Sequence, residues 1–204
     1  MTTKQIILIG SSLLLLVSCA PETSQTKPAN TAALQQLVMQ QKEQEKTATL
    51  SLTTSDPLTV TAGGTFTVLV TLQNPAHTQI DSVRSWLTFD PTKLHVQSMD
   101  DHKSAFDLAL ADEKKFDNMT GIVSIGRSSS MVQNGNPLQV EQIVFQALSR
   151  GDEATTAINF YDYKANTEGH TGVYHLVNGT PYNIVQEPKN TSLRLTILAN
   201  KIKR

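Results

Sequence analysis

Candidate catalytic and metal-binding residues are scattered along this sequence. The five histidines form no HExxH pattern, and no Cys-x-x-Cys pair exists, so no metal site of recognised spacing is present. Asp100-Asp101-His102 could hold a cation, but a polar stretch of this kind is more typical of a solvated loop. Residues 121–126, Gly-Ile-Val-Ser-Ile-Gly, miss the nucleophile motif G-x-S-x-G by one position and lie in an expected strand. We therefore expect no catalysis, no metal and no cofactor.

One stripe of side chains offers binding chemistry instead. Within residues 80–89, Val83, Leu87 and Phe89 share one parity of an expected strand and are typical of a core. The other parity places Arg84 and Trp86 side by side on the solvated face, and both residue types are enriched at binding hot spots. The alternative is that Trp86 is half buried at the edge of the core, since tryptophan is highly buried on average. The predicted partner-binding residues, one of them on a neighbouring strand, are Ser82, Arg84, Trp86, Thr88 and Ser124.

A second aromatic group is a candidate for stacking on sugar rings. Tyr161 and Tyr163 are two residues apart on an expected strand, opposite in parity to Phe160. Such side chains offer an apolar face and a polar tip. Trp86 could serve the same purpose. The alternative is that the tyrosines pack against a loop.

The elements that position these residues are short strands. Period-two alternation on both sides of Gly63-Gly64 predicts a β-hairpin. Residues 106–111 fit a strand or a helical turn equally well, and residues 128–137 are expected to be a loop. About nine or ten strands separated by turn signals indicate an all-β sandwich or jelly roll. The expected strands are 49–53, 58–62, 65–73, 80–89, 93–99, 122–127, 139–148, 155–163, 173–177 and 192–198.

Composition and charge exclude some classes of function. The 204 residues carry a formal charge of −1, which gives no basic footprint for nucleic acid. A domain of about 150 residues buries roughly two thirds of its unfolded surface and needs no disulfide. The only cysteine is Cys19.

The N-terminal residues indicate export. Lys4 precedes an apolar run, residues 5–17, that has the length of a signal-peptide core and is short for a membrane span. Leu16-Val17-Ser18-Cys19 resembles the lipobox of bacterial lipoproteins, which implies cleavage before Cys19 and lipidation of its thiol. The alternative is an ordinary signal peptide followed by a buried cysteine. The lipobox implies a protein held by its N-terminus on the extracytoplasmic side of a membrane in the bacterial cell envelope.

The expected organisation has four segments. Residues 1–18 form the lipoprotein signal peptide, and residues 19–47 form the lipidated N-terminus and a linker. The linker is rich in Pro, Thr, Ser and Gln and is expected to be disordered, with a short helix in 31–46. Residues 48–199 form the β-sandwich domain, and 200–204 form a basic tail.

Three stretches in this order resemble the cohesin domain. Residues 58–72 are similar to its opening V-x-A-G-(G/D)-x-F-x-V-x-V segment, and residues 86–94 to its strand and Asp-Pro turn. Residues 121–125, with 138–145 after a loop, are similar to its G-x-I-x-x and L-x-x-I-x-F segments. The resemblance covers about residues 48–198. It implies a nine-stranded jelly roll, related to certain carbohydrate-binding modules and without catalytic activity.

The resemblance also implies a binding face. Cohesins bind a dockerin on a partner protein through one flat sheet face, which in well-known members carries an Asn-x-Asp pair. Ser82 and Arg84 occupy the matching positions here, so a guanidinium stands where a carboxylate is usual, and we expect a partner with a different charge pattern.

Three functions follow as hypotheses. The first is a non-catalytic, membrane-anchored module that holds a protein partner, dockerin-like or other, through this sheet face. The alternative is direct binding of polysaccharide, linked to polysaccharide breakdown. The third is a structural component of an envelope assembly.

Overall fold

The computed structural model describes residues 47–148, 152–161, 170–186 and 192–199. The chain divides into two compact units, Met1–Val38 and Met39–Arg204, and every described residue lies in the second. The expected signal peptide, Cys19 and nearly all of the linker lie outside the described residues, as does the basic tail. Twelve strands and no helix are present in the described part of the chain. None of its segments forms a helix long and apolar enough to be a membrane span.

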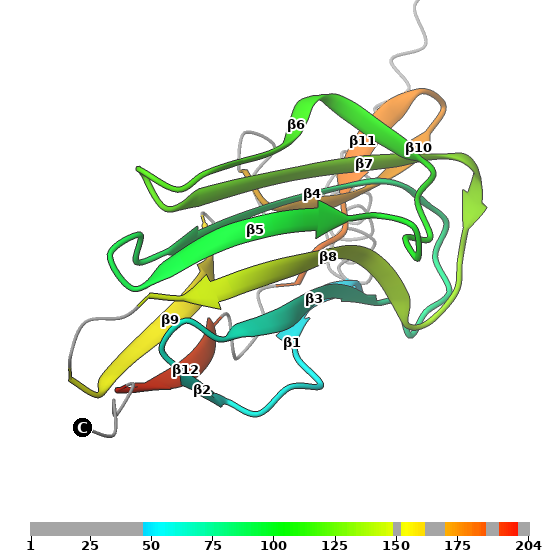
Figure 1. Ribbon diagram of the computed structural model, residues 1–204. Coiled ribbons are helices and arrows are strands. Elements are labelled where there is room, and N and C mark those ends of the chain that lie inside the picture. The colour runs from blue at the N-terminus through cyan, green and yellow to red at the C-terminus, as the bar shows by residue number, and fades with distance from the viewer. Residues whose placement is uncertain (1–46, 149–151, 162–169, 187–191, 200–204) are drawn as a thin grey trace, which may run out of the picture. The chain divides into compact units, whose positions relative to one another are not determined.

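Four strands form the smaller sheet. Its order is β1 (Thr49–Thr53), β3 (Thr65–Gln73), β8 (Leu138–Ala147) and β5 (Leu94–Asp100), and all neighbours are antiparallel. From top to bottom in Figure 1 they are β5, β8, β3 and β1.

The larger sheet is centred on β4 (Ile80–Phe89). One edge of β4 pairs with β7 (Ile122–Gln133), which in turn pairs with β6 (Leu108–Asp117). The other edge pairs with β10 (Gly172–Val177) near residues 82–84 and with β9 (Ala154–Phe160) near residues 87–89. Beyond these lie β11 (Thr180–Asn183) next to β10, then β12 (Ser192–Leu198) next to β9, and finally β2 (Thr59–Thr61).

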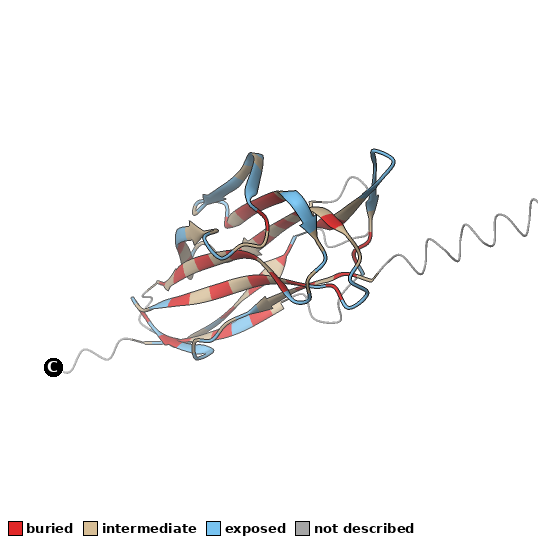
Figure 2. Cartoon of the chain, turned by 90° about the vertical axis from the view of Figure 1, so that its right-hand side faces the viewer, coloured by how far each residue is buried: buried red, intermediate tan, exposed pale blue. Residues whose placement is uncertain are grey.

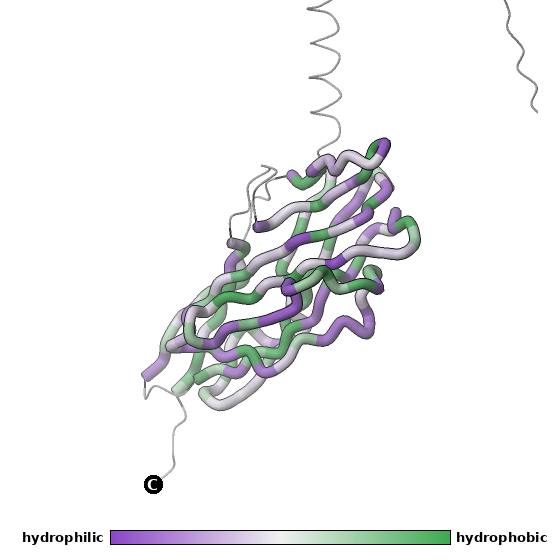
Figure 3. Tube along the Cα trace, turned by 90° about the horizontal axis from the view of Figure 1, so that it is seen from above, coloured by the Kyte–Doolittle hydropathy of each residue, from purple (hydrophilic) through white to green (hydrophobic). Residues whose placement is uncertain are grey.

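The core lies between the two sheets and is built by alternation. Along β3 and β4 every second side chain is buried, and Phe66 packs against Phe145 of β8 with ring centroids 5.6 Å apart. Buried and partly exposed residues alternate along the strands in Figure 2. Hydrophobic and hydrophilic residues alternate in a similar way in Figure 3. This confirms the expected all-β jelly-roll sandwich, with twelve strands in place of nine.

The hairpin predicted at Gly63-Gly64 is wrong. β2 joins the larger sheet as a parallel neighbour of β12, whereas β3 joins the smaller sheet between β1 and β8. The turn therefore carries the chain from one sheet to the other. Gly63 adopts a φ of 86°, a conformation that favours glycine, and its N–H donates to the carbonyl of Ala147 at 2.8 Å. Alternation predicts which face is buried but not which strand is the neighbour.

Two further segments differ from expectation. The ambiguous residues 106–111 lead into β6, a strand interrupted by an irregularity between Ala109 and Lys114. The loop expected at 128–137 is strand as far as Gln133, because β7 continues to pair with β4 up to Ile80.

A buried ion pair joins the two sheets. Arg127 of β7 is 1% exposed and Glu141 of β8 is fully buried, and the guanidinium donates two hydrogen bonds to one carboxylate oxygen. A bulge in β8 places both Val140 and Glu141 on the core side. Asp101 binds Arg127 and Lys114, each at 2.7 Å. The network ties the loop after β5 to both sheets.

Candidate binding face on the larger sheet

The predicted stripe lies on the outer side of the larger sheet. Ser82, Arg84, Trp86 and Thr88 are partly exposed and alternate with buried residues of β4. We call this surface, together with the adjoining outer sides of β6, β7 and β10, the β4 face. Its strands lie side by side in Figure 1.

Arg84 is locked in place by an ion pair across β7. Its guanidinium donates two hydrogen bonds to Glu113 of β6, one from Nε to Oε2 at 3.0 Å and one from Nη2 to Oε1. Gly126 of β7 lies opposite Arg84, between the two partners. A Cβ atom at Gly126 would lie 2.4 Å from a carboxylate oxygen of Glu113 and 2.6 Å from its Cβ. The glycine therefore leaves the space through which Glu113 reaches Arg84.

A second glycine opens the other flank of Arg84. Gly172 of β10 lies opposite Arg84 on that side, and a Cβ there would lie 2.8 Å from the hydroxyl of Tyr174. The hydrogen bonds with Glu113 raise the pKa of Arg84, and the Tyr174 phenol adds to this. Burial raises the pKa of Tyr174. Arg84 is therefore an always-charged group whose charge is compensated within the face.

An aromatic cluster lies beside this ion pair. The rings of Trp86 and His170 are 4.3 Å apart between centroids, Tyr161 and His170 are 5.2 Å apart, and Trp86 and Tyr161 stack at 6.4 Å. Tyr161 is 42% exposed, and Trp86 is partly buried. Rings in such contact offer a large, rigid surface to a ligand.

Hydrogen bonds to the backbone fix the position of this cluster. The fully buried Thr171 hydroxyl accepts from the N–H of Trp86 at 3.3 Å and donates to the carbonyl of Tyr161 at 2.9 Å. The N–H of Tyr161 in turn donates to the carbonyl of Trp86 at 2.7 Å. The residues that carry the three rings are thereby held to the same stretch of β4.

A pocket of about 200 Å³ lies on the side of Trp86 that faces β6 and β7. Lys115, Phe116 and Ile122 line it with Trp86. The indole Nε1 is buried and has no hydrogen-bond acceptor among the described residues. Trp86 therefore lies between the rings of Tyr161 and His170 on one side and this pocket on the other. Such a position is suitable for a residue that contacts a binding partner.

Ser124 lies largely beneath the surface of the β4 face, at the pocket beside Trp86. It lies opposite both Trp86 and Lys115 in the strand register, but it is only 3% exposed. Its larger neighbours cover it, and its hydroxyl donates to the carbonyl of Lys115 at 3.5 Å. Its contact with a partner stays a prediction, restricted to that pocket. Tyr163 lies outside the described residues.

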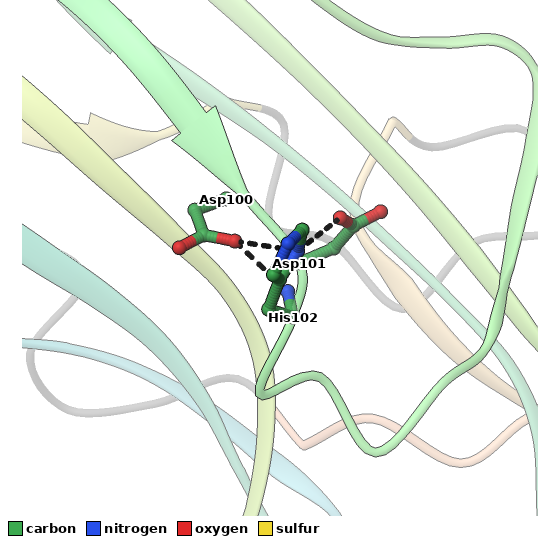
Figure 4. Close-up of side chains that lie close together, drawn as sticks. All are labelled: Asp100, Asp101 and His102. Carbon is green, nitrogen blue, oxygen red and sulfur yellow. Dashed lines mark hydrogen bonds and ion pairs between the residues drawn. The ribbon is translucent and has the colours of Figure 1, made fainter.

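The acidic turn after β5 does gather in space. Ligand atoms of Asp100, Asp101 and His102 lie within 4.8 Å of one another, as Figure 4 shows. The Asp101 carboxylate, however, is bonded to Lys114 and Arg127, which lower its pKa to about 2. These two cations oppose the binding of a third.

Sequence reasoning missed Glu113, His170 and the two glycines. An isolated glycine inside a strand pattern signals a close approach, so Gly126 and Gly172 could have pointed to bulky neighbours. The pairing of Glu113 with Arg84 crosses an intervening strand, and His170 lies outside any strand. Neither the Glu113–Arg84 pair nor the position of His170 could be predicted from the spacing of residues along the sequence.

Comparison with known proteins decides the family. Residues 48–180 match the model of the cohesin domain. The chain belongs to the cohesin domain family. Cohesin domains are non-catalytic protein-binding modules, so this part of the chain is one of them. A search of curated proteins gives no match.

Solved cohesins share the fold at low sequence identity. The seventh ScaB type I cohesin from Pseudobacteroides cellulosolvens is 15% identical, with a TM-score of 0.53 over 77% of this chain and 96% of its own. A cohesin module of a family 33 glycoside hydrolase from Clostridium perfringens is 11% identical, with a TM-score of 0.53 over 76% and 99%. The Coh-OlpA–Doc918 type I cohesin–dockerin complex from Clostridium thermocellum gives 12% identity and a TM-score of 0.51 over 74% and 99%.

Proposed function

We propose that this cohesin domain holds a dockerin-like protein partner through the β4 face. The observation that carries the proposal is the half-exposed cluster of Trp86, Tyr161 and His170 on the outer side of the central strand. The strand positions agree with those through which the family resemblance implies dockerin binding. The cohesin–dockerin complex from Clostridium thermocellum supports a partner of this kind.

The ion pair of Arg84 and Glu113 sets the chemistry of that partner. A guanidinium that already donates to a carboxylate of its own chain offers little net charge to an acidic ligand. We therefore expect the partner to contact the β4 face with apolar or aromatic side chains seated against Trp86 and Tyr161. Affinity should then depend weakly on salt, because interactions between screened surface charges contribute little.

The test is titration calorimetry with dockerin modules encoded in the same genome. We expect saturable one-to-one binding by the purified protein and a loss of at least about tenfold in affinity for Trp86→Ala, since aromatic anchors dominate interface energetics. The matched control is Thr65→Ala, on the exposed side of β3 in the smaller sheet.

Two results would contradict the proposal. Equal affinity of the Trp86→Ala and unsubstituted proteins would remove the β4 face as the site. An equal loss in the Thr65→Ala variant would show that the contact lies on the smaller sheet. Circular dichroism of each variant establishes that the fold is retained.

A second candidate function is direct binding of polysaccharide by the same rings. The observation that favours it is the near-parallel stack of Trp86 and Tyr161, with 26° between the ring planes. Partly exposed rings in this arrangement could contact the C–H faces of consecutive sugars. Retention of the protein on insoluble glycans, abolished by Tyr161→Ala and unaffected by Thr65→Ala, would support this function. Failure to bind any glycan while a dockerin module binds would exclude it.

The proposal includes an anchor in a bacterial membrane. Residues 16–19 and the single cysteine support lipidation of Cys19, and the following linker would hold the domain on the extracytoplasmic side. The expected segments 1–18, 19–47, 48–199 and 200–204 belong to the same proposal.

A further inference from the structure

A larger hollow lies elsewhere on the outer side of the larger sheet. It measures about 600 Å³ and is bordered by β9, β12 and the residues around the start of β2. These strands lie together at the lower left of Figure 1, whereas β6, β10 and β11 lie at the top. β9 begins at this hollow and ends next to Tyr161 of the aromatic cluster. The hollow is thus separate from the β4 face.

The strand register explains how the hollow forms. Thr155 of β9 lies opposite Thr196 of β12, and Thr196 lies opposite Thr59 of β2, so three threonines form one row across the sheet. In the next row Arg194 lies opposite Ala157. The small side chain of Ala157 leaves space beside the guanidinium.

Among the described residues that line the hollow, Arg194 is the only cationic one. It is exposed, and it forms no ion pair with any carboxylate of the described residues. This distinguishes it from Arg84 and Arg127, which are both held by glutamates. A guanidinium with no ion pair among the described residues, next to a concave surface, is suited to bind a carboxylate with two parallel hydrogen bonds.

The other groups that line the hollow could contact the hydroxyls and the C–H face of a sugar that carries such a carboxylate. The hydroxyls of Thr59, Thr155 and Thr196 can each donate and accept, as sugar hydroxyls do. Leu58, which is 50% exposed, and Ala157 add apolar surface for the C–H face of a ring. The volume falls in the range of roughly 300–1,000 Å³ that is usual for small-molecule sites.

We propose that this hollow binds a short acidic oligosaccharide, whose carboxylate pairs with Arg194 while its hydroxyls contact the row of Thr59, Thr155 and Thr196. The site is independent of the protein-binding face. A domain with both sites joins a protein partner and an acidic glycan at once.

The test is a nuclear magnetic resonance titration of the purified, ¹⁵N-labelled protein with digalacturonate and trigalacturonate. We expect saturable shifts of the amides of Ala157, Arg194 and Thr196, and a dissociation constant at least about tenfold higher for Arg194→Gln. Lys103→Gln, which removes the same charge from an exposed loop, is the matched control and should bind as the unsubstituted protein does.

Comparison ligands show whether binding depends on the sugar, on the negative charge or on both. Neutral oligosaccharides of the same length should bind at least about tenfold more weakly, and so should acetate, inorganic phosphate and a short glutamate peptide. Equal binding of acetate, phosphate or the peptide would overturn the assignment to a sugar. Unchanged affinity in Arg194→Gln, or no saturable shift up to about 10 mM galacturonate, would overturn the site itself.

Discussion

Gly126 and Glu113 determine how Arg84 lies on the β4 face. Gly126 has an ordinary backbone conformation, so the difficulty with a larger residue is steric: a new Cβ would lie 2.4 Å from a Glu113 oxygen. We expect Gly126→Ala to lower the free energy of unfolding by about 1–3 kcal/mol, as overpacking usually does. Urea denaturation measures the change.

The double variant Gly126→Ala, Glu113→Ala is the control for this explanation. It removes the carboxylate that would lie 2.4 Å from the new Cβ, although the Cβ of residue 113 at 2.6 Å remains, so it should recover part of the lost stability. A double variant less stable than Gly126→Ala would show that the collision is not the cause.

Asp101 gives a second prediction at the scale of the residue. Its pKa is lowered to about 2 by Lys114 and Arg127, below the value of an unfolded aspartate. The resulting stabilisation is present above about pH 4 and is lost as the pH falls towards 2, because the folded state must then take up a proton. Its carboxylate is 29% exposed, so we expect on the order of 1–2 kcal/mol.

Asp101→Asn tests this dependence. The variant should be less stable at pH 7 and should show a smaller loss between pH 4 and pH 2, measured by denaturant unfolding at each pH. Asp152→Asn is a matched control, because Asp152 is exposed and its carboxylate lies in no ion pair among the described residues. An unchanged pH profile in Asp101→Asn would assign the acid dependence to other groups.

At the scale of the element, the contact between β7 and β8 depends on a buried charge pair. Removing one partner leaves the other buried and uncompensated, so Arg127→Met should cost about 3–5 kcal/mol. Burial already raises the pKa of Glu141, and the loss of Arg127 should raise it further. A carboxyl pKa raised by folding means that stability falls as the pH rises through that range, so the variant should recover stability in mild acid.

The double variant Arg127→Met, Glu141→Leu separates charge from packing. Two apolar side chains of similar volume remove the uncompensated charge, so the double variant should be more stable than Arg127→Met at pH 7. Thermal unfolding followed by circular dichroism measures both. A double variant no more stable than the single one would show that shape rather than charge sets the cost.

The strands also show what sequence patterns can and cannot predict. β4 and β12 were predicted with the bounds that the structure has, because alternation and Asp-Pro or loop signals mark them. Asn178-Gly179, a common turn dipeptide, joins the paired strands β10 and β11 with φ of 51° and 80°. Gly63-Gly64 carries a similar signal but joins two sheets. Local sequence specifies the turn, whereas the core decides which sheet receives the next strand.

The same limit applies to the candidate site. Parity placed Arg84 and Trp86 on the outer side of β4, but exposure depends on neighbours from β6, β7 and the loop before β10. Those neighbours bury Ser124 and pair Arg84 with Glu113. Glu113 therefore compensates most of the positive charge that Arg84 was expected to present to a partner. This could not be predicted without knowing that β6 lies next to β7 and β7 next to β4.

At the scale of the whole molecule, the linker connects the binding domain to its proposed anchor. The described domain begins at residue 47, and 27 residues separate it from Cys19 in the sequence. We propose that these residues act as a linker that lets the domain reach a partner without moving the anchor. The domain and the anchor should therefore act independently, so that each can be lost without the other.

Cys19→Ser tests this independence. Each buried methylene of an acyl chain contributes about 0.8 kcal/mol to membrane affinity, and two or more chains give a durable anchor. We expect the unsubstituted protein to incorporate labelled palmitate and to sediment with membranes, and Cys19→Ser to do neither while keeping its affinity for the dockerin partner. Trp86→Ala is the reciprocal control, since it should be labelled and sediment normally but bind the partner weakly. Labelling of Cys19→Ser would place the lipid elsewhere, and lost partner binding in that variant would show that the anchor and the β4 face depend on each other.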